Sequence, residues 1–208
     1  MGEDAVMRLS SRSSSGFTLL ELAIVLLVLT LLLGRFALPL AAQREARQVR
    51  EAEAKMLEIR AALLGHAVLY GYLPCPDLNG AGLAAANCAA NGEGDLPYKT
   101  LGLTSGDDPW GRSWRYRVDR NFANQPIRFA TPFADGLQIY NRYGEKLSTD
   151  EERPIFILMS AGPNGRLDGD NALASNRYQT GTPEREFDDL IFWLSRPTLF
   201  HHLIMAGR

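Results

Sequence analysis

The pattern of apolar and polar positions separates the chain into an apolar first segment, an amphipathic second segment and a mixed remainder. The apolar run covers residues 17–33, and its only ionisable side chain is Glu21. Together with the apolar patch that follows it, a helix of residues 17–42 would measure about 39 Å, which is enough to cross the apolar core of a bilayer. We therefore expect a membrane-spanning helix here, with a kink or local melting at Pro39, which lacks a backbone donor.

Residues 43–70 have the period of an amphipathic helix. Apolar residues recur at alternating spacings of three and four, at Val49, Ala52, Met56, Ile59 and Leu63. This spacing places them on one face of a helix, and an acid and a base four residues apart, Glu51 and Lys55, add a supporting pair. A short coiled coil is the alternative, but the stripe covers barely two heptads. We expect the helix to end before Gly71 and its apolar face to lie on a head domain.

The remainder of the chain, residues 71–208, combines a loop-like stretch with short strand patterns. Residues 74–111 are rich in Gly, Ala, Asn and Asp, which predicts a long loop. Apolar and polar residues then alternate between Trp114 and Asp119, as in a half-buried strand. Further strands are predicted at residues 127–133, 137–140, 155–159 and 190–194. One N-terminal helix followed by several short strands predicts an α+β fold with a small antiparallel sheet.

Composition limits the classes of partner. The chain has 208 residues, of which 46% are hydrophobic and 22% charged. Beyond the two helical segments, this length suits one modest globular domain. The 22 basic residues are balanced by 24 acidic ones, so there is no excess of positive charge to bind phosphates. These numbers argue against a nucleic acid as the main partner.

The two cysteines, Cys75 and Cys88, lie after the apolar segment. Because that segment would export whatever follows it, both thiols should enter an oxidising compartment, where a disulfide is the default. Closing so short a loop would stabilise the head by about 3 kcal/mol on the chain-entropy model. A metal site is the alternative, but two thiols without a nearby histidine fall short of a tetrahedral ligand set.

Glu21 is the most informative residue of the apolar run. A carboxylate deep in a bilayer costs roughly 2.5–3.5 kcal/mol, which makes it a functional candidate. Its position, four residues after the Gly16–Phe17 junction, resembles the N-terminal signal of type IV prepilins and type II secretion pseudopilins. The resemblance implies that a prepilin peptidase cuts between Gly16 and Phe17 and methylates the new amino group of Phe17. It also implies that Glu21 faces the N-terminal amine of a neighbouring subunit, the cation that a buried carboxylate needs.

Three other interpretations of the N-terminal segment make different predictions. A secretory signal peptide needs a small-x-small cleavage site after the apolar core, but residues 39–43 place Leu or Pro at the −3 position. A plain uncleaved anchor leaves Glu21 unexplained, and a run this apolar does not suit a core helix in a chain of this size. Translation from Met1 and translation from Met7 both remain open.

Three head segments extend the resemblance. Residues 108–111, Asp-Pro-Trp-Gly, resemble the segment that leads into a strand of the major pseudopilins of type II secretion. Residues 160–165 and 188–191 resemble the two ends of the calcium loop and closing strand of those proteins. Residues 74–105 and the tail after Ser195 have no counterpart.

The densest group of oxygen ligands outside the charged helix consists of Asp168, Asp170, Asn171, Asp188 and Asp189. Calcium takes about six to eight oxygen ligands, which such a loop could supply together with backbone carbonyls. The chain also departs from the calcium-loop pattern, because Arg166 lies inside the loop and residues 172–186 separate its acidic groups. The alternative is a solvated turn in which Asp188 caps the next element, and both interpretations stay open.

No catalytic motif is present. His66, His201 and His202 lack the spacing of metal ligands, and neither a nucleophile elbow nor a phosphate-binding glycine motif occurs. We expect His66 to pack on a helix face and the protein not to be an enzyme. The apolar tail either packs Phe200, Leu203 and Ile204 on the head or forms an exposed contact patch.

The resemblance implies a structural subunit of a type II secretion pseudopilus or a type IV pilus, with the pseudopilus favoured. Residues 1–16 would be the leader, 17–42 the transmembrane and filament-core helix, 43–70 the amphipathic helix and 71–208 the head. The implied partners are prepilin peptidase, other pilin-like subunits and an inner-membrane assembly platform. The protein would cross the bacterial inner membrane once, with its head in the periplasm, until it enters the filament.

Two hypotheses of other classes compete with this one. In the first, the head is a ligand-binding or adhesive module on a pilin anchor. The disulfide loop and the aromatic residues Trp110, Trp114 and Tyr116 would then form the binding surface. In the second, the chain is an uncleaved single-span periplasmic protein.

Overall fold

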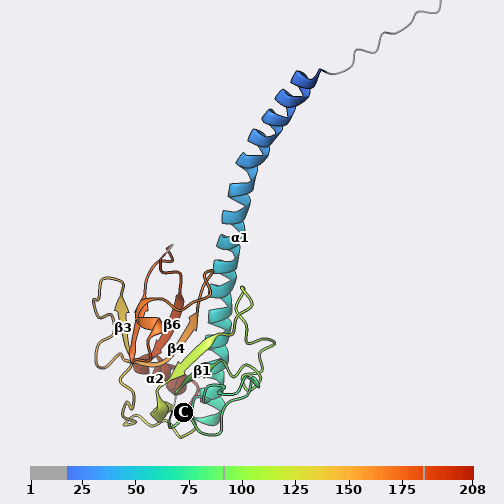
Figure 1. Ribbon diagram of the computed structural model, residues 1–208. Coiled ribbons are helices and arrows are strands. Elements are labelled where there is room, and N and C mark those ends of the chain that lie inside the picture. The colour runs from blue at the N-terminus through green and yellow to red at the C-terminus, as the bar shows by residue number, and fades with distance from the viewer. Residues whose placement is uncertain (1–17, 91, 185) are drawn as a thin grey trace, which may run out of the picture. The chain divides into compact units, whose positions relative to one another are not determined.

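The computed structural model describes residues 18–90, 92–184 and 186–208, except for the side chains of residues 33–42. The chain divides into two compact units between Arg44 and Glu45. In chain order the elements are α1 (Leu19–Tyr70), β1 (Glu93–Asp95), β2 (Arg115–Val118), η1 (Arg120–Phe122), β3 (Gln138–Asn141), β4 (Pro154–Ser160), η2 (Gly169–Ala172), β5 (Arg177–Thr180), β6 (Leu190–Ser195) and α2 (Arg196–Met205) (Figure 1).

Helix α1 begins with a capped first turn. The backbone N–H of Glu21 donates to Oγ1 of Thr18 at 3.2 Å, so Thr18 is the N-cap of a Thr-x-x-Glu sequence. The helix ends at Tyr70 because Gly71 follows with a φ of +81°, the left-handed conformation that commonly terminates helices. The guanidinium of Arg208 donates to the carbonyl of Leu69 at 2.7 Å and satisfies one of the last carbonyls.

The expected membrane span lies in the first part of α1. The backbone is helical through Pro39, where the sequence predicts a kink or local melting. Among the side chains that the structure describes, no helical stretch is both long enough and apolar enough to cross a membrane. The expected span, residues 17–42, includes residue 17 and the side chains of residues 33–42, which lie outside the described part of the chain.

The main sheet is antiparallel and has the strand order β1-β2-β4-β6. Its register places Tyr116 of β2 opposite Leu158 of β4, and Leu158 opposite Phe192 of β6. Strand β4 is buried along its whole length, as its continuous apolar sequence requires of a central strand. The α+β class with a small antiparallel sheet is therefore confirmed. Strand β1 is an addition, because it lies within the stretch predicted to be a loop.

A second, smaller sheet covers one face of the main sheet. It consists of β3 and β5, which pair in parallel, whereas the sequence predicts only the first of these strands. Its buried residues Ile139 and Tyr178 pack with Ile157 and Met159 of β4. The predicted strand at residues 127–133 is wrong. Those residues form turns, in which the backbone N–H of Thr131 donates to the carbonyl of Arg128 at 2.9 Å.

The opposite face of the main sheet packs on the second part of α1. The predicted stripe is buried at Ala52, Met56, Ile59 and Leu63 and partly buried at Val49. It shares one core with Trp114, Tyr116, Val118, Phe156 and Leu158. This arrangement confirms the amphipathic helix, and it stacks helix, main sheet and small sheet as three layers.

The tail forms helix α2. The sequence leaves open whether this tail packs on the head or forms an exposed patch. Leu199, Phe200 and Leu203 are buried in the core that α1 shares. Ile204, which was expected to pack with them, is 60% exposed. The spacing explains the difference, because positions 199, 200 and 203 share one face of a helix whereas 204 lies at its margin.

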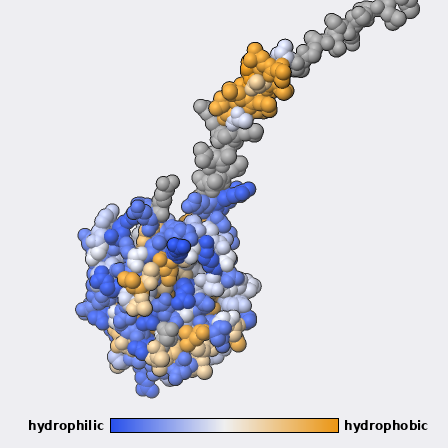
Figure 2. Space-filling view, viewed as in Figure 1, coloured by the Kyte–Doolittle hydropathy of each residue, from blue (hydrophilic) through white to orange (hydrophobic). Residues whose placement is uncertain are grey.

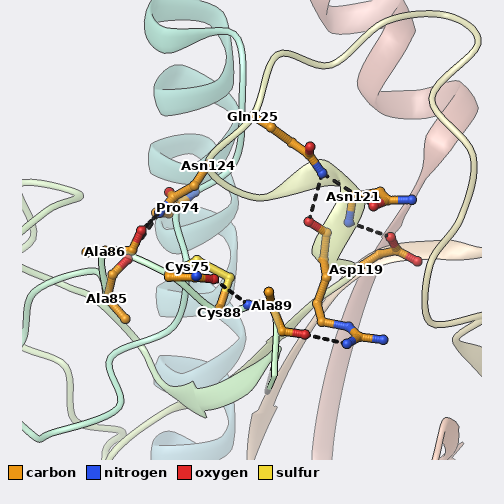
Figure 3. Close-up of a disulfide and its surroundings, with 12 residues drawn as sticks. Pro74, Cys75, Ala85, Ala86, Cys88, Ala89, Asp119, Asn121, Asn124 and Gln125 are labelled. Atoms are coloured by element: carbon orange, nitrogen blue, oxygen red, sulfur yellow. Dashed lines mark hydrogen bonds between the residues drawn. A yellow bond between two sulfur atoms is a disulfide. The ribbon is translucent and has the colours of Figure 1, made fainter.

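The predicted disulfide is formed between Cys75 and Cys88 (Figure 3). Side chains from the segment after β2 donate hydrogen bonds to backbone carbonyl groups in and next to the loop that the disulfide closes. The amide of Asn124 donates to Ala85 and Ala86, each at 3.1 Å. The guanidinium of Arg120 donates to the carbonyl of Ala89, just beyond the second cysteine.

We predict that replacing both cysteines by serine lowers the free energy of unfolding of the head by about 3 kcal/mol, because the open loop regains its conformational entropy. Urea unfolding of the full-length protein in detergent micelles, followed by the fluorescence of the buried Trp114, measures this change. Wild-type protein kept in a reductant is the matched control and should lose the same amount. Equal stability of oxidised wild type and the double variant would contradict the prediction.

Candidate functional site

The first part of α1 presents an apolar surface that surrounds one acid. The exposed large apolar side chains are Leu19, Leu20, Leu22, Ile24, Val25, Leu26, Leu27, Val28, Leu29, Leu31 and Leu32 (Figure 2). They occupy every side of the helix, so this segment has no polar face. A continuous exposed apolar surface of this kind marks a contact with membrane or with protein.

Glu21 lies in the first turn of this segment. Two features of the fold act on it: its backbone N–H is bonded to Thr18, and the positive end of the helix dipole favours a negative charge there. The predicted processing residues, Gly16 and Phe17, lie outside the described residues. This cap was not predicted, although the Thr-x-x-Glu spacing from Thr18 to Glu21 is the sequence signal for it.

A second candidate site combines Asp168 with the adjacent pair Asp188 and Asp189. One carboxylate oxygen of each lies within 4.8 Å of the others. Asp168 comes from the segment between β4 and η2, and the pair comes directly before β6. The two segments approach closely at Gly162, where a Cβ would lie 2.2 Å from the carbonyl oxygen of Asp188. Only glycine fits at that position, whose φ of +55° also favours it.

Each segment donates backbone N–H groups to the carboxylates of the other. The N–H of Asn164 donates to Oδ2 of Asp188 at 2.8 Å, and the N–H of Asp168 donates to Oδ2 of Asp189 at 2.8 Å. In return, the N–H of Asp188 donates to Oδ2 of Asp168 at 3.2 Å. These bonds orient all three carboxylates without neutralising them.

Two carboxylate oxygens of this site are buried without a hydrogen-bond partner among the described residues, Oδ1 of Asp188 and Oδ1 of Asp189. Burial raises the pKa of both groups, in the case of Asp189 to about 6, and the negative charge of nearby Asp168 adds to the effect. A buried acceptor left unpaired costs about 1–3 kcal/mol, and more when it is charged. A cation bound next to these two oxygens would remove this cost.

The structure separates the other two predicted ligands from this group. The carboxylate of Asp170 faces Arg177, with Oδ2 3.4 Å from Nε. The side-chain amide of Asn171 donates to Oδ2 of Asp189 at 2.8 Å and to the carbonyl of Gln179 at 3.0 Å, and it accepts from the N–H of Gln179 at 2.7 Å. Asn171 thus holds Asp189 in place rather than pointing an oxygen at the same centre.

These observations fit a calcium ion better than a transition metal. All donors are hard oxygens. One carboxylate oxygen from each of Asp168, Asp188 and Asp189 lies within 4.8 Å of the others, and Asp188 and Asp189 each have one buried oxygen without a partner among the described residues. Calcium prefers such carboxylate and carbonyl ligands in flexible geometry. Asp168, Asp188 and Asp189 are the residues that would hold it.

The remaining candidates from the sequence lie elsewhere. Trp114 and Tyr116 are buried in the core, so they offer no binding surface. His66 is also buried, with Nδ1 3.0 Å from the carbonyl oxygen of Tyr72, and burial lowers its pKa. His201 and His202 are neighbours on α2 with ring centroids 5.9 Å apart.

The comparison with known proteins concerns the N-terminal segment. Residues 11–34 match the family described as the prokaryotic N-terminal methylation motif. This motif is the signal of type IV pilin-like and pseudopilin proteins, and the match is confined to the N-terminal segment. It implies processing by prepilin peptidase and assembly with other pilin-like subunits. No curated protein and no solved structure matches the chain significantly.

Proposed function

We propose that the chain is a pilin-like structural subunit of a type II secretion pseudopilus or a type IV pilus and has no enzymatic activity. Prepilin peptidase would cut between Gly16 and Phe17, and the mature subunit would assemble by stacking its N-terminal helix. The observation that carries this proposal is the methylation motif at residues 11–34, within which helix α1 exposes apolar side chains on every side around Glu21.

Helix stacking would supply the driving force for assembly. The apolar side chains between Leu19 and Leu32 leave lipid and become covered by the same segment of neighbouring subunits. Glu21 would pair with the amine of Phe17 on a neighbour, and this pair would set the stagger between subunits. Because desolvation offsets most of the attraction in a buried ion pair, its contribution would be to register more than to net stability.

The proposed location is the bacterial inner membrane, with a single pass and the head in the periplasm. The disulfide between Cys75 and Cys88 supports this location, since such bonds persist in oxidising compartments. The partners would be prepilin peptidase, other pilin-like subunits and an inner-membrane assembly platform.

A pseudopilus is favoured over a pilus by the way two head segments meet. Oγ of Ser160 donates to Oδ2 of Asp108 at 2.6 Å, and both groups are buried. The guanidinium of Arg112 donates to the carbonyl of Gly162 at 2.6 Å. Two of the segments that resemble parts of a pseudopilin head, residues 108–111 and 160–165, thus form one unit. The proposed calcium site is next to this unit, because the N–H of Asn164 donates to Oδ2 of Asp188.

One observation favours a second candidate function, a ligand-binding or adhesive head. A cavity of about 560 Å³ adjoins the disulfide, and amide side chains of Asn121, Asn124 and Gln125 line it (Figure 3). Binding of a glycan or peptide by the full-length protein, lost when the cavity is filled by Ala123→Trp, would support this function.

We expect Glu21→Ala to be processed normally but to enter filaments poorly, because the carboxylate that sets the stagger is missing. Immunoblotting of processed protein and of sheared filaments measures the two steps separately. Glu53→Ala, which removes an exposed acid from the same helix, is the matched control and should assemble like wild type. Normal incorporation of Glu21→Ala would disprove the register role.

We expect calcium to stabilise the wild-type head, by about 2.7 kcal/mol at a concentration one hundred times Kd. Asp189→Asn should abolish this response. Without calcium the same variant should be more stable than wild type, because it removes one of three carboxylates that repel one another. Thermal unfolding in calcium and in chelator measures both effects, and Asp170→Asn should respond to calcium like wild type. A calcium response retained in Asp189→Asn would exclude the site.

A further inference from the structure

We propose that a calcium ion at Asp168, Asp188 and Asp189 also fastens strand β5 to the head, through the side-chain amide of Asn171. The ion would thereby control the order of the whole β3–β5 layer. This inference rests on the calcium site of the proposed function and adds a structural consequence to it.

The side-chain amide of Asn171 bonds to the backbone of β5 in the way that a neighbouring strand would. Its Oδ1 accepts from the N–H of Gln179 at 2.7 Å, and its Nδ2 donates to the carbonyl of the same residue at 3.0 Å. The amide therefore satisfies both backbone groups of one residue of β5, as a paired strand would. Only 3% of Asn171 is exposed, so water competes little for these bonds.

The same amide also touches the proposed ion site. Nδ2 of Asn171 donates to Oδ2 of Asp189 at 2.8 Å. The position of Asn171 is fixed from its own side as well, because its backbone N–H donates to the carbonyl of Asp168 at 3.0 Å, through the short helix η2. Asn171 thus joins both halves of the acidic site to one residue of β5.

The β3–β5 layer depends on such an anchor. It has two strands of four residues each, and an isolated two-stranded sheet is marginally stable in water. The strands pair in parallel, so no tight hairpin turn connects them. Its main packing is the contact of Ile139 and Tyr178 with β4. On the side of β5 away from β3, Asn171 satisfies both backbone groups of Gln179. The hydroxyl of Ser175, in the segment just before β5, bonds to both backbone groups of Arg177, so Asn171 is the contact that reaches β5 from the acidic site.

Without a cation, the three carboxylates repel one another while Asp189 holds the amide of Asn171. Any movement that separates the carboxylates would pull on Asn171 and loosen its two bonds to β5. A bound ion removes the repulsion and fixes Asp168 and Asp189 relative to each other. The consequence would reach the surface, because the turn after β3 carries Tyr143, which is 83% exposed. Calcium would therefore determine how rigidly the head presents this outer face.

Hydrogen exchange of the full-length protein in detergent micelles, in calcium chloride and in chelator, tests the coupling. Calcium should slow exchange in peptides covering residues 138–141 and 177–180 at least tenfold. Residues 52–63 of α1, which pack on the opposite face of the main sheet, should change much less and serve as the internal reference. Isothermal titration with calcium chloride measures binding on the same sample, and magnesium chloride is the control for ionic strength.

The variant Asn171→Ala separates the coupling from the binding. It should bind calcium within about tenfold of wild type, since it keeps all three carboxylates, but calcium should no longer protect residues 177–180. Calcium binding by wild type without protection of β5 would overturn the coupling and leave the calcium site standing. Absence of calcium binding by wild type would overturn both, whereas the N-terminal processing of the chain would be unaffected. Loss of binding in Asn171→Ala would also overturn the inference, because Asn171 would then belong to the site itself.

Discussion

The apolar surface of α1 between Leu19 and Leu32 is the constraint on which the behaviour of this protein depends. At about 25 cal/mol per Å² of apolar area, such a surface cannot remain in water. A surface of this kind is normally covered by lipid or by protein, and the proposed function assigns it to lipid and then to the same segment of other subunits. In the head, the apolar stripe from Ala52 to Leu63 is buried against the main sheet. One helix therefore carries two apolar surfaces, and the described part of the chain covers the second of them.

Both candidate sites consist of carboxylates that lack a cation of their own. Glu21 stands among exposed apolar side chains, and Asp188 and Asp189 each bury an unpaired oxygen. In each case the missing charge would come from outside the subunit, as the amine of a neighbour or as a calcium ion. Such an arrangement makes the stability of the subunit depend on its surroundings, since a partner that binds only the native or assembled state stabilises that state.

The sequence was sufficient where a short-range pattern decides the structure. The stripe of α1, strands β2, β4 and β6 and the disulfide follow from period, composition or the expected compartment. The methylation motif follows from the resemblance of the Gly16–Phe17 junction and Glu21 to the prepilin signal. The sequence was insufficient where tertiary contacts decide. Strand β5 is polar, and its contacts are with distant residues, through the bonds of Asn171 to Gln179 and the packing of Tyr178. Residues 127–133 have strand-like composition but form turns. Asp168, Asp188 and Asp189 were predicted together with Asp170 and Asn171, because composition cannot tell a ligand from the residue that positions it.

The most direct test of this account is the mass and N-terminal residue of the protein, from cells with and without prepilin peptidase. The account predicts a chain that starts at methylated Phe17 only when the peptidase is present. A start at residue 1 or 7 in both strains would contradict it and indicate an uncleaved anchor. A start near Gln43 would identify an ordinary secretory signal instead.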